Sequence, residues 1–174
     1  DDDVDGREGD DTIYGDLVTA DVAATVGGND TLNGGLGNDI LYAGAGNDNL
    51  NGGDGQDTLY GGIGDDYLDG GIDTDQDLLY GNEGKDRLIS RGGQDRLSGG
   101  NGDDFYSIEG TDNAWVFLND AGSGFDTARV RAPGAVNTQT TFVVSGTRLE
   151  VRINDASGAL IDGVSARSGG VRMY

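Results

Sequence analysis

The sequence predicts an all-β fold in which short strands stack as repeating coils. Residues 34–69 consist of four nine-residue units in direct succession: GGLGNDILY, AGAGNDNLN, GGDGQDTLY and GGIGDDYLD. Glycine accounts for 34 of the 174 residues, whereas proline occurs once. The 32 acidic residues outnumber the 11 basic residues and give a net charge of −21. A chain with this charge and few apolar residues is typical of disorder, so we expect it to need bound cations to fold.

Each unit is predicted to be a turn followed by a very short strand. A large aliphatic residue at position 8 lies between mostly polar or aromatic neighbours, which is typical of a strand with one buried face. Glycine at positions 1, 2 and 4 is expected to permit positive φ angles and to let carbonyl oxygens approach one another. Aspartate at position 6 ends the turn. Because calcium needs about six to eight oxygen ligands, one turn supplies part of a site and a second turn stacked on it supplies the rest.

Two units make one coil, so turns on the same edge recur every eighteen residues, with coils about 4.8 Å apart. The spacing therefore predicts two columns of aspartates as calcium ligands. One edge would carry Asp11, Asp30, Asp48, Asp66, Asp86 and Asp104. The other edge would carry Asp21, Asp39, Asp57, Asp77 and Asp95. One ion in each gap gives up to about nine calcium ions, which would nearly neutralise the chain, so we expect it to be unfolded without calcium.

The repeat begins near the N-terminus and is interrupted twice. The opening DDDVDG resembles the start of an EF-hand loop, but Thr12 stands at its twelfth position, so an acidic lead-in to the first unit, residues 6–14, is the better interpretation. Residues 15–24 are interpreted as a degenerate coil around Asp21, and residues 25–33 restore the unit. Residues 70–80 contain two extra residues that should bulge from a turn. Regular units then continue to residue 107.

Beyond residue 107 the repeat fades. Asp126 lies in a last turn-like unit, and Trp115, Phe117 and Leu118 are expected to plug the open end of the stack. From Pro133 onward, short apolar runs separated by glycine or by Asn and Asp predict antiparallel strands packed on that end. The sequence therefore predicts a calcium-binding roll over residues 1–107 and a capping segment with a C-terminal β-strand cap over residues 108–174.

A second periodic feature occupies position 9 of alternate units. Tyr42, Tyr60 and Tyr80 are one coil apart and should stack on the outer face of one sheet. Such a row either shields the sheet or offers a binding strip for sugars, and shielding is the simpler interpretation.

Composition excludes several classes of function. Without cysteine there is no disulfide or thiolate metal site, and without histidine there is no zincin or serine-triad chemistry. No group stands ready as the base of a nucleophile, so we expect no enzymatic activity. The acidic balance disfavours nucleic acid as a partner, and no apolar run is long enough for membrane insertion.

Residues 6–107 resemble the RTX, or haemolysin-type, calcium-binding repeats, whose pattern GGxGxDxUx the units of residues 34–69 match closely. The resemblance implies a right-handed parallel β-roll that is disordered in the cytoplasm, leaves a Gram-negative cell through type I secretion machinery and folds outside it on millimolar calcium. It implies that the column aspartates and turn carbonyls surround each ion. The carbonyl donors that it nominates are Gly35, Gly37, Gly44, Gly46, Gly53, Gly55, Gly62 and Gly64.

The functional prediction is thus a calcium-binding module, without catalysis, of a larger secreted, extracellular bacterial protein. A start without methionine and an end at VRMY, unlike the export signals of the family, lead us to expect a longer natural chain. An alternative is an accessory module of a polysaccharide-modifying enzyme, in which Lys85, Arg87, Arg91 and Arg96 help to hold an extracellular polymer. A third is a spacer or adhesin segment. The threonine of ice-binding rolls is missing from position 3, which holds Leu36, Ala45, Asp54 and Ile63.

Overall fold

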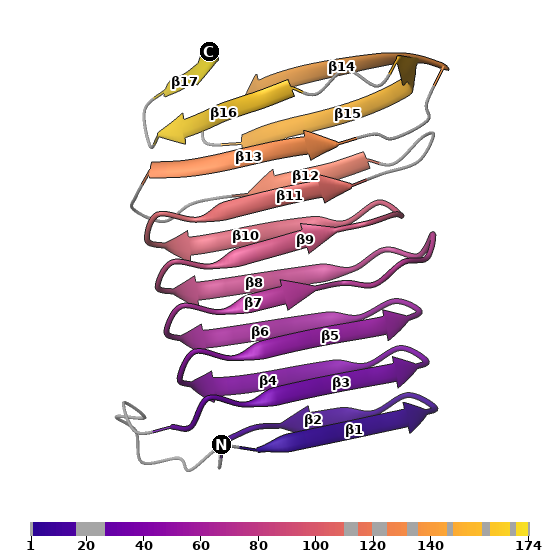
Figure 1. Cartoon of the computed structure of the whole chain (residues 1–174), viewed down its shortest axis with the longest axis vertical. Coiled ribbons are helices and arrows are strands. Elements are labelled where there is room, and N and C mark those ends of the chain that lie inside the picture. Colours follow the sequence, from indigo (N-terminus) through magenta and orange to yellow (C-terminus); the bar gives the residue numbers. More distant parts are fainter. Residues whose placement is uncertain are drawn as a thin grey trace.

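A computed structural model describes residues 2–16, 27–109, 115–119, 125–131, 136–145, 148–157, 161–167 and 170–173. All regular elements in these ranges are strands, and they form two sheets that face each other (Figure 1). The first sheet has the order β1 (Asp3–Glu8), β3 (Thr31–Leu36), β5 (Asn49–Asp54), β7 (Tyr67–Asp69), β9 (Arg87–Ser90), β11 (Phe105–Glu109), β13 (Phe125–Arg131), β16 (Ile161–Arg167) and β17 (Gly170–Met173). The second has the order β14 (Val136–Ser145), β15 (Arg148–Ser157), β12 (Trp115–Asn119), β10 (Arg96–Asn101), β8 (Leu78–Glu83), β6 (Thr58–Ile63), β4 (Ile40–Ala45) and β2 (Thr12–Tyr14).

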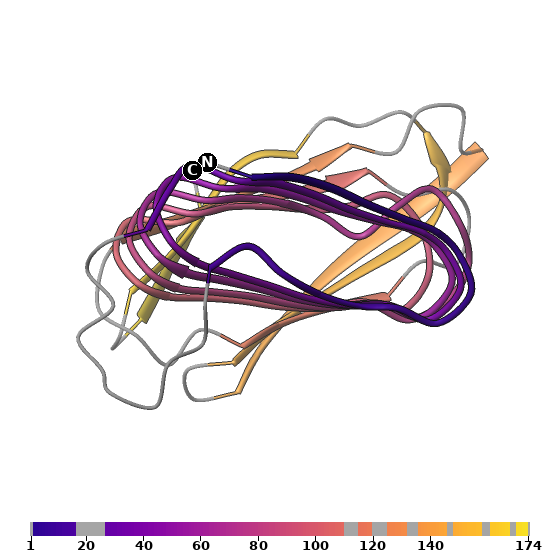
Figure 2. The same ribbon diagram turned by 90° about the horizontal axis from the view of Figure 1, so that it is seen from below.

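From β1 to β13 the chain alternates between the two sheets, so each strand as far as β11 pairs in parallel with the strand one coil later. Thr31 pairs with Asn49, and Ile40 pairs with Thr58, each at the predicted eighteen-residue offset. Seen along the stack, the coils superimpose as a flattened ring whose long sides are strands and whose ends are turns (Figure 2). The predicted all-β, parallel β-roll of stacked nonapeptides is therefore confirmed.

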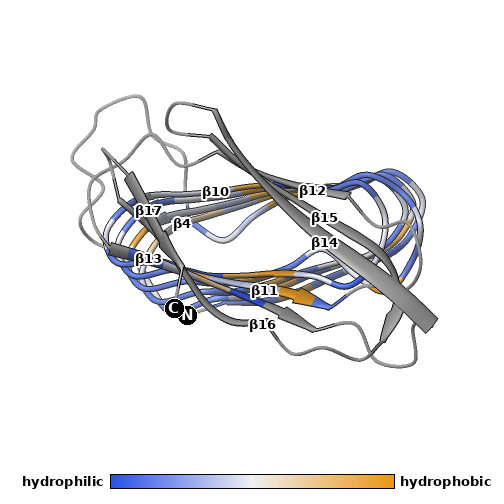
Figure 3. Cartoon of the chain, turned by 90° about the horizontal axis from the view of Figure 1, so that it is seen from above, coloured by the Kyte–Doolittle hydropathy of each residue, from blue (hydrophilic) through white to orange (hydrophobic). Residues whose placement is uncertain are grey.

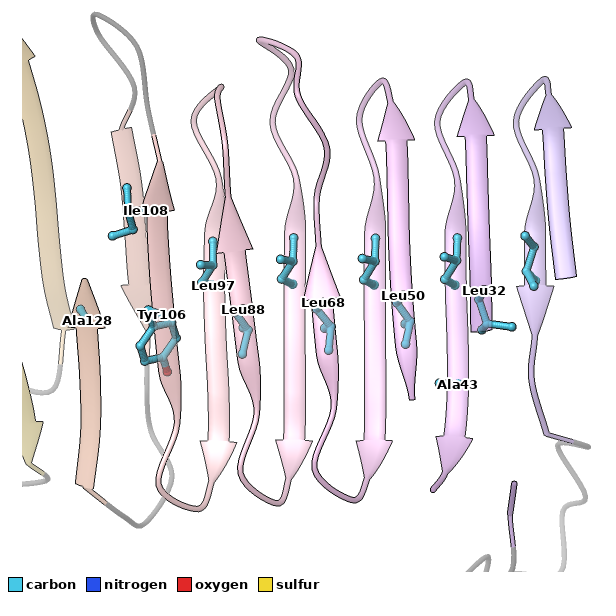
Figure 4. Packing of buried hydrophobic residues seen from close by; sticks show 13 residues of the cluster. Leu32, Ala43, Leu50, Leu68, Leu88, Leu97, Tyr106, Ile108 and Ala128 are labelled. Atoms are coloured by element: carbon cyan, nitrogen blue, oxygen red, sulfur yellow. The ribbon is translucent and has the colours of Figure 1, made fainter. Parts of the chain in front are cut away.

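The core is a double ladder of the position 8 side chains. Leu50 and Leu68 project inward from one sheet (Figure 4). Leu41 and Leu59 belong to the other sheet and to the same core cluster, and all four side chains have no exposed surface. In the hydropathy view, apolar segments lie along the strands and the turns are hydrophilic (Figure 3). Tyr106 continues the ladder near its C-terminal end, and its hydroxyl accepts a hydrogen bond from the Gly99 N–H at 2.8 Å. Regular stacking of one apolar side chain per unit thus holds the turns in register.

The N-terminal register differs from the prediction. Thr31 pairs with Asp3, and Ile40 pairs with Thr12, so both offsets are 28 instead of 18 and the chain contains ten additional residues at this point. The degenerate coil predicted for residues 15–24 is therefore wrong, because β1 and β2 stack directly on β3 and β4. Asp21 lies outside the described residues.

The turn at this insertion is formed by residues that precede the insertion and residues that follow it. The Gly15 N–H donates to the Tyr42 carbonyl at 2.9 Å and the Asp16 N–H to the Ala43 carbonyl at 3.0 Å. An Asp16 carboxylate oxygen also accepts the Ala45 N–H at 2.8 Å. Gly15 and Asp16 thus provide the first two positions of the unit that Asp30 completes.

The insertion at residues 70–80 bulges from a turn as predicted, and the strand phase resumes when Thr58 pairs with Leu78. In regular turns the position 4 N–H donates to a backbone carbonyl of the next coil, as Gly37 does to Asp54 at 2.9 Å. Here Gly55 donates to the Asp73 carboxylate at 2.8 Å. Both insertions therefore begin with an aspartate whose side chain restores a hydrogen bond between coils.

The two ends of the chain also form strands. Residues 3–8 form β1, which pairs with β3, so the EF-hand alternative is wrong. At the other end parallel pairing continues through β12 and β13. The remaining strands, β14 to β17, pair antiparallel, which confirms the prediction for the tail. The domain boundary at residue 107 stays a prediction, and the side chains predicted to plug the stack, Trp115, Phe117 and Leu118, lie outside what the structure describes. None of the described residues belongs to a helix that would span a membrane.

Candidate calcium sites at the turns

The position 6 aspartates form two columns, one at each edge of the roll. Within a column, the backbone N–H of each aspartate donates to the Oδ1 atom of the aspartate in the next coil, as Asp39 does to Asp57 at 2.8 Å and Asp48 to Asp66 at 2.9 Å. One column contains Asp11, Asp39, Asp57, Asp77 and Asp95. The other contains Asp2, Asp30, Asp48, Asp66, Asp86, Asp104 and Asp126.

This arrangement changes one predicted column. Asp11 was expected beside Asp30, but its N–H donates to Asp39 at 2.7 Å, and Asp30 instead accepts from the Asp2 N–H at 2.7 Å. The ten-residue insertion is the physical reason. Because these residues do not add a unit to the roll, Asp11 lies at the edge opposite to the one predicted. Asp2 and Asp126 join the same column, and neither was among the predicted ligands.

In several column carboxylates the second oxygen is buried without a hydrogen-bond partner in the protein. Asp57 has no exposed surface and Asp39 is 1% exposed, yet their Oδ2 atoms receive no hydrogen bond. The carboxylates for which this holds include Asp11, Asp39, Asp48, Asp57, Asp66 and Asp86. An unpaired buried charge is strongly unfavourable, so a row of them indicates that a cation belongs beside these oxygens.

Carbonyl oxygens lie close to the same place. A side chain built on Gly6 would meet the Gly34 carbonyl oxygen at 2.5 Å and Asp11 Oδ2 at 2.8 Å. The equivalent position at Gly34 is bounded by Asp39 Oδ2 and the Gly52 carbonyl oxygen, and that at Gly52 by Asp57 Oδ2 and the Gly70 carbonyl oxygen. A carboxylate oxygen from one turn and a carbonyl oxygen from the next therefore converge where glycine leaves room.

These position 1 carbonyls of Gly34, Gly52 and Gly70 were missed by sequence reasoning, which nominated positions 2 and 4. The signal was the frequent glycine at position 1. Its backbone does not adopt positive φ, in contrast to that of Gly35 at 109° and Gly37 at 128°, so this glycine is needed for space. The nominated carbonyls lie along the stack instead: the Gly35 oxygen lies 2.1 Å from the place where a Cβ atom on Gly53 would stand. Their role as calcium ligands stays a prediction.

A family model for the RTX calcium-binding nonapeptide repeat matches the chain four times, at residues 1–17, 24–59, 42–77 and 73–106. The chain belongs to the RTX calcium-binding repeat family. Searches among curated proteins and among solved structures found no match to it. The RTX repeat is a structural calcium-binding unit, so the chain is a calcium-binding β-roll module.

The residues present fit calcium. A hard cation takes carboxylate and carbonyl oxygens, and the turns of Asp11, Asp39 and Asp57 each offer a buried Oδ2 together with a carbonyl oxygen of the next coil. Within the described ranges, no three acidic side chains converge on one point, so backbone carbonyls have to provide most of each coordination shell. When bound, calcium would neutralise the Oδ2 charge and join neighbouring coils.

Burial changes the acidity of the metal-free RTX columns. Desolvation raises the pKa of Asp57 and Asp86 to about 7 and that of Asp66 and Asp77 to about 8, from an ordinary value of 3.8. Hydrogen bonds from backbone N–H groups oppose this shift, and neighbouring aspartates reinforce it. Without calcium, the folded columns therefore hold protons that the unfolded chain has released.

This linkage predicts how pH acts on the metal-free chain. Because the folded-state pKa values lie above the unfolded value, stability is greatest at low pH and is lost as pH rises from about 4 to about 8. In metal-depleted buffer, circular dichroism should show β-structure increasing as pH falls from 8 to 5. The calcium-saturated chain is the control and should change little over the upper part of this range. A metal-free spectrum that stays constant between pH 8 and pH 5 would contradict the buried, charged columns.

A second set of side chains fastens the RTX turns from outside. At position 5 of several units, the backbone N–H donates to a side-chain oxygen of the preceding coil: Asn47 donates to Asn29, and Asp65 to Asn47, at 2.8 and 2.9 Å. Gln56 donates to Asn38 in the same way at 2.8 Å. These bonds run opposite to those of the aspartate columns. The recurrence of Asn or Asp before the position 6 aspartate was the sequence signal for them.

The basic residues that the polymer-binding alternative required do not form one surface. Arg87 lies in β9 of the first sheet, and Arg96 lies in β10 of the second. The Arg87 guanidinium stacks between Tyr67 and Phe105, at 5.6 and 5.4 Å from their ring centroids. The other two cations contact acids: Arg91 lies 2.9 Å from Asp69, and Lys85 lies 3.6 Å from Asp103. Three of the four basic side chains therefore contact aromatic or acidic residues of the roll itself.

The predicted tyrosine row is confirmed and extends to Tyr14. Successive rings of Tyr14, Tyr42, Tyr60 and Tyr80 lie 5.1, 4.8 and 5.0 Å apart and nearly parallel. The faces of the middle rings are therefore covered by their neighbours. Because sugars stack on ring faces, this geometry favours the interpretation that the row shields the sheet.

Proposed function

We propose that this chain is the calcium-dependent folding module of a larger secreted bacterial protein, exported through type I secretion machinery and folded outside the cell. The observation that carries the proposal is the set of buried Oδ2 atoms that receive no hydrogen bond, among them those of Asp48, Asp57 and Asp66. With a net charge of −21, such columns oppose folding where calcium is scarce and favour it where calcium is abundant. A chain that stays unfolded inside and folds outside suits export through a narrow channel.

The carboxylates of the module are accounted for by structural roles, so a catalytic role is not needed to explain them. The column aspartates accept backbone N–H groups and face the predicted ions, while several outer acids fasten turns, as Asp65 does by accepting the Lys85 N–H at 2.8 Å. We propose that the effector activity of the protein resides elsewhere in the full-length chain. Calcium ions and the export machinery are then the expected partners of this module.

A calcium titration of the chelator-treated chain tests the proposal. Far-ultraviolet circular dichroism should change cooperatively from coil to β-structure near millimolar calcium, because each ion joins two coils and neighbouring sites share a turn. Magnesium is the control and should not replace calcium, since it demands a small octahedral shell. A chain that is already folded in chelator and unaffected by calcium would rule out the folding switch.

A further inference from the structure

Position 1 of each unit lies against the Oδ2 atom of the aspartate at position 6, and its identity varies. Most described units have glycine there, such as Gly52 beside Asp57. The unit AGAGND has Ala43, which is fully buried, and the unit SRGGQD has Ser90, which is 1% exposed. Position 1 is therefore occupied by glycine, alanine or serine, and of these only serine can donate a side-chain hydrogen bond to the carboxylate.

Ser90 alters the surroundings of its aspartate. The Ser90 hydroxyl donates a hydrogen bond to Asp95 Oδ2. Asp95 Oδ1 already accepts the Asp77 N–H at 3.0 Å. Both carboxylate oxygens of Asp95 therefore have donors from the protein.

The unit with Ala43 provides the comparison. Asp48 Oδ1 accepts the Asp30 N–H at 2.8 Å, as expected for its column. Its Oδ2 atom is buried and receives no hydrogen bond. A Cβ atom at position 1 is thus compatible with an unpartnered Oδ2, and the difference at Asp95 comes from the hydroxyl group.

We infer that the Ser90 hydroxyl takes the place of calcium at Asp95, so that this turn closes without a metal ion. A hydroxyl hydrogen and a calcium ion both seek the same oxygen, and the donated hydrogen bond relieves the buried charge that otherwise demands a cation. The column through Asp57 and Asp77 then binds one ion fewer than its aspartates suggest. The inference rests on the proposed calcium sites and adds the residue that sets their number.

Reciprocal substitutions test it. Ser90→Ala leaves Asp95 in the state of Asp48 and should raise the number of bound calcium ions by one. Ala43→Ser provides a hydroxyl beside Asp48 and should lower the number by one. Ser107→Ala is the matched control, because Ser107 is a buried serine whose hydroxyl contacts Glu109 at 3.5 Å and no column aspartate; its count should equal that of the unaltered chain.

Native mass spectrometry of the calcium-saturated chains counts the ions, and circular dichroism confirms that each variant is folded. A gain with Ser90→Ala and a loss with Ala43→Ser support the inference. An unchanged count in Ser90→Ala overturns it, and this variant still decides if Ala43→Ser does not fold. If the unaltered chain binds no calcium, the proposed function fails as well; if it binds calcium while the variants match it, only the role of Ser90 fails.

Discussion

Replacing Asp57 by asparagine is expected to remove one calcium ion and to raise the calcium concentration at the midpoint of folding roughly tenfold, which corresponds to about 1.4 kcal/mol. Asp57 is fully buried in the middle of its column. Asparagine retains an oxygen for the Asp39 N–H, which Asp57 accepts at 2.8 Å, but it removes the charge that binds the ion. The calcium midpoint is measured by circular dichroism and the ion count by native mass spectrometry.

Asp54→Asn is the matched control for this prediction. Asp54 belongs to the same unit and its substitution removes the same charge, but it lies exposed at position 3. The midpoint should then move only slightly, as expected for a screened surface charge. Equal shifts in the two variants would mean that overall charge, and not the column, determines the response to calcium.

Leu59→Ala is expected to lower the free energy of unfolding of the calcium-loaded chain by about 2 to 5 kcal/mol. Leu59 has no exposed surface and lies between Leu41 and Leu79 in the adjacent coils. Because each coil contacts only its neighbours, the cavity weakens two interfaces at once. Urea unfolding at saturating calcium measures the change.

Ile63→Ala serves as the control for the core prediction. Ile63 is an aliphatic residue in the same strand, β6, but it is 46% exposed. Its truncation should change the free energy of unfolding by no more than about 0.5 kcal/mol. Similar losses for Leu59→Ala and Ile63→Ala would contradict the leucine ladder as the main apolar contribution.

The regular part of the roll could be predicted because the nine-residue period marks the core residues and the candidate calcium ligands together. The inward aliphatic position, represented by Leu59, and the aspartate position, represented by Asp57, recur with the same period, so the core and the columns could be predicted from the spacing. The prediction of a coil at residues 15–24 was wrong because Asp21 keeps the spacing of a coil by coincidence. The spacing in the sequence does not reveal whether these residues add a coil, and the direct pairing of Thr12 with Ile40 shows that no coil lies between the two strands.

Other features depend on side-chain neighbours that no periodicity reveals. The hydroxyl of Ser90 and the carboxylate of Asp95 are five residues apart in the chain, and their contact follows from the path of the turn. Arg87 and Arg96 lie on different sheets because they belong to successive units, and successive units alternate between the sheets. Closeness in the sequence suggested one basic cluster, but the fold places its members on two sheets.

The two insertions show where this scaffold accepts foreign sequence. Asp16 and Asp73 each restore a hydrogen bond to the neighbouring coil at the start of an insertion, one of ten residues and the other of two. An engineer who wishes to display a peptide on a calcium-triggered scaffold would therefore graft it immediately after such an aspartate, at the edge of the roll. The same peptide placed within a strand would shift every later side chain to the wrong face.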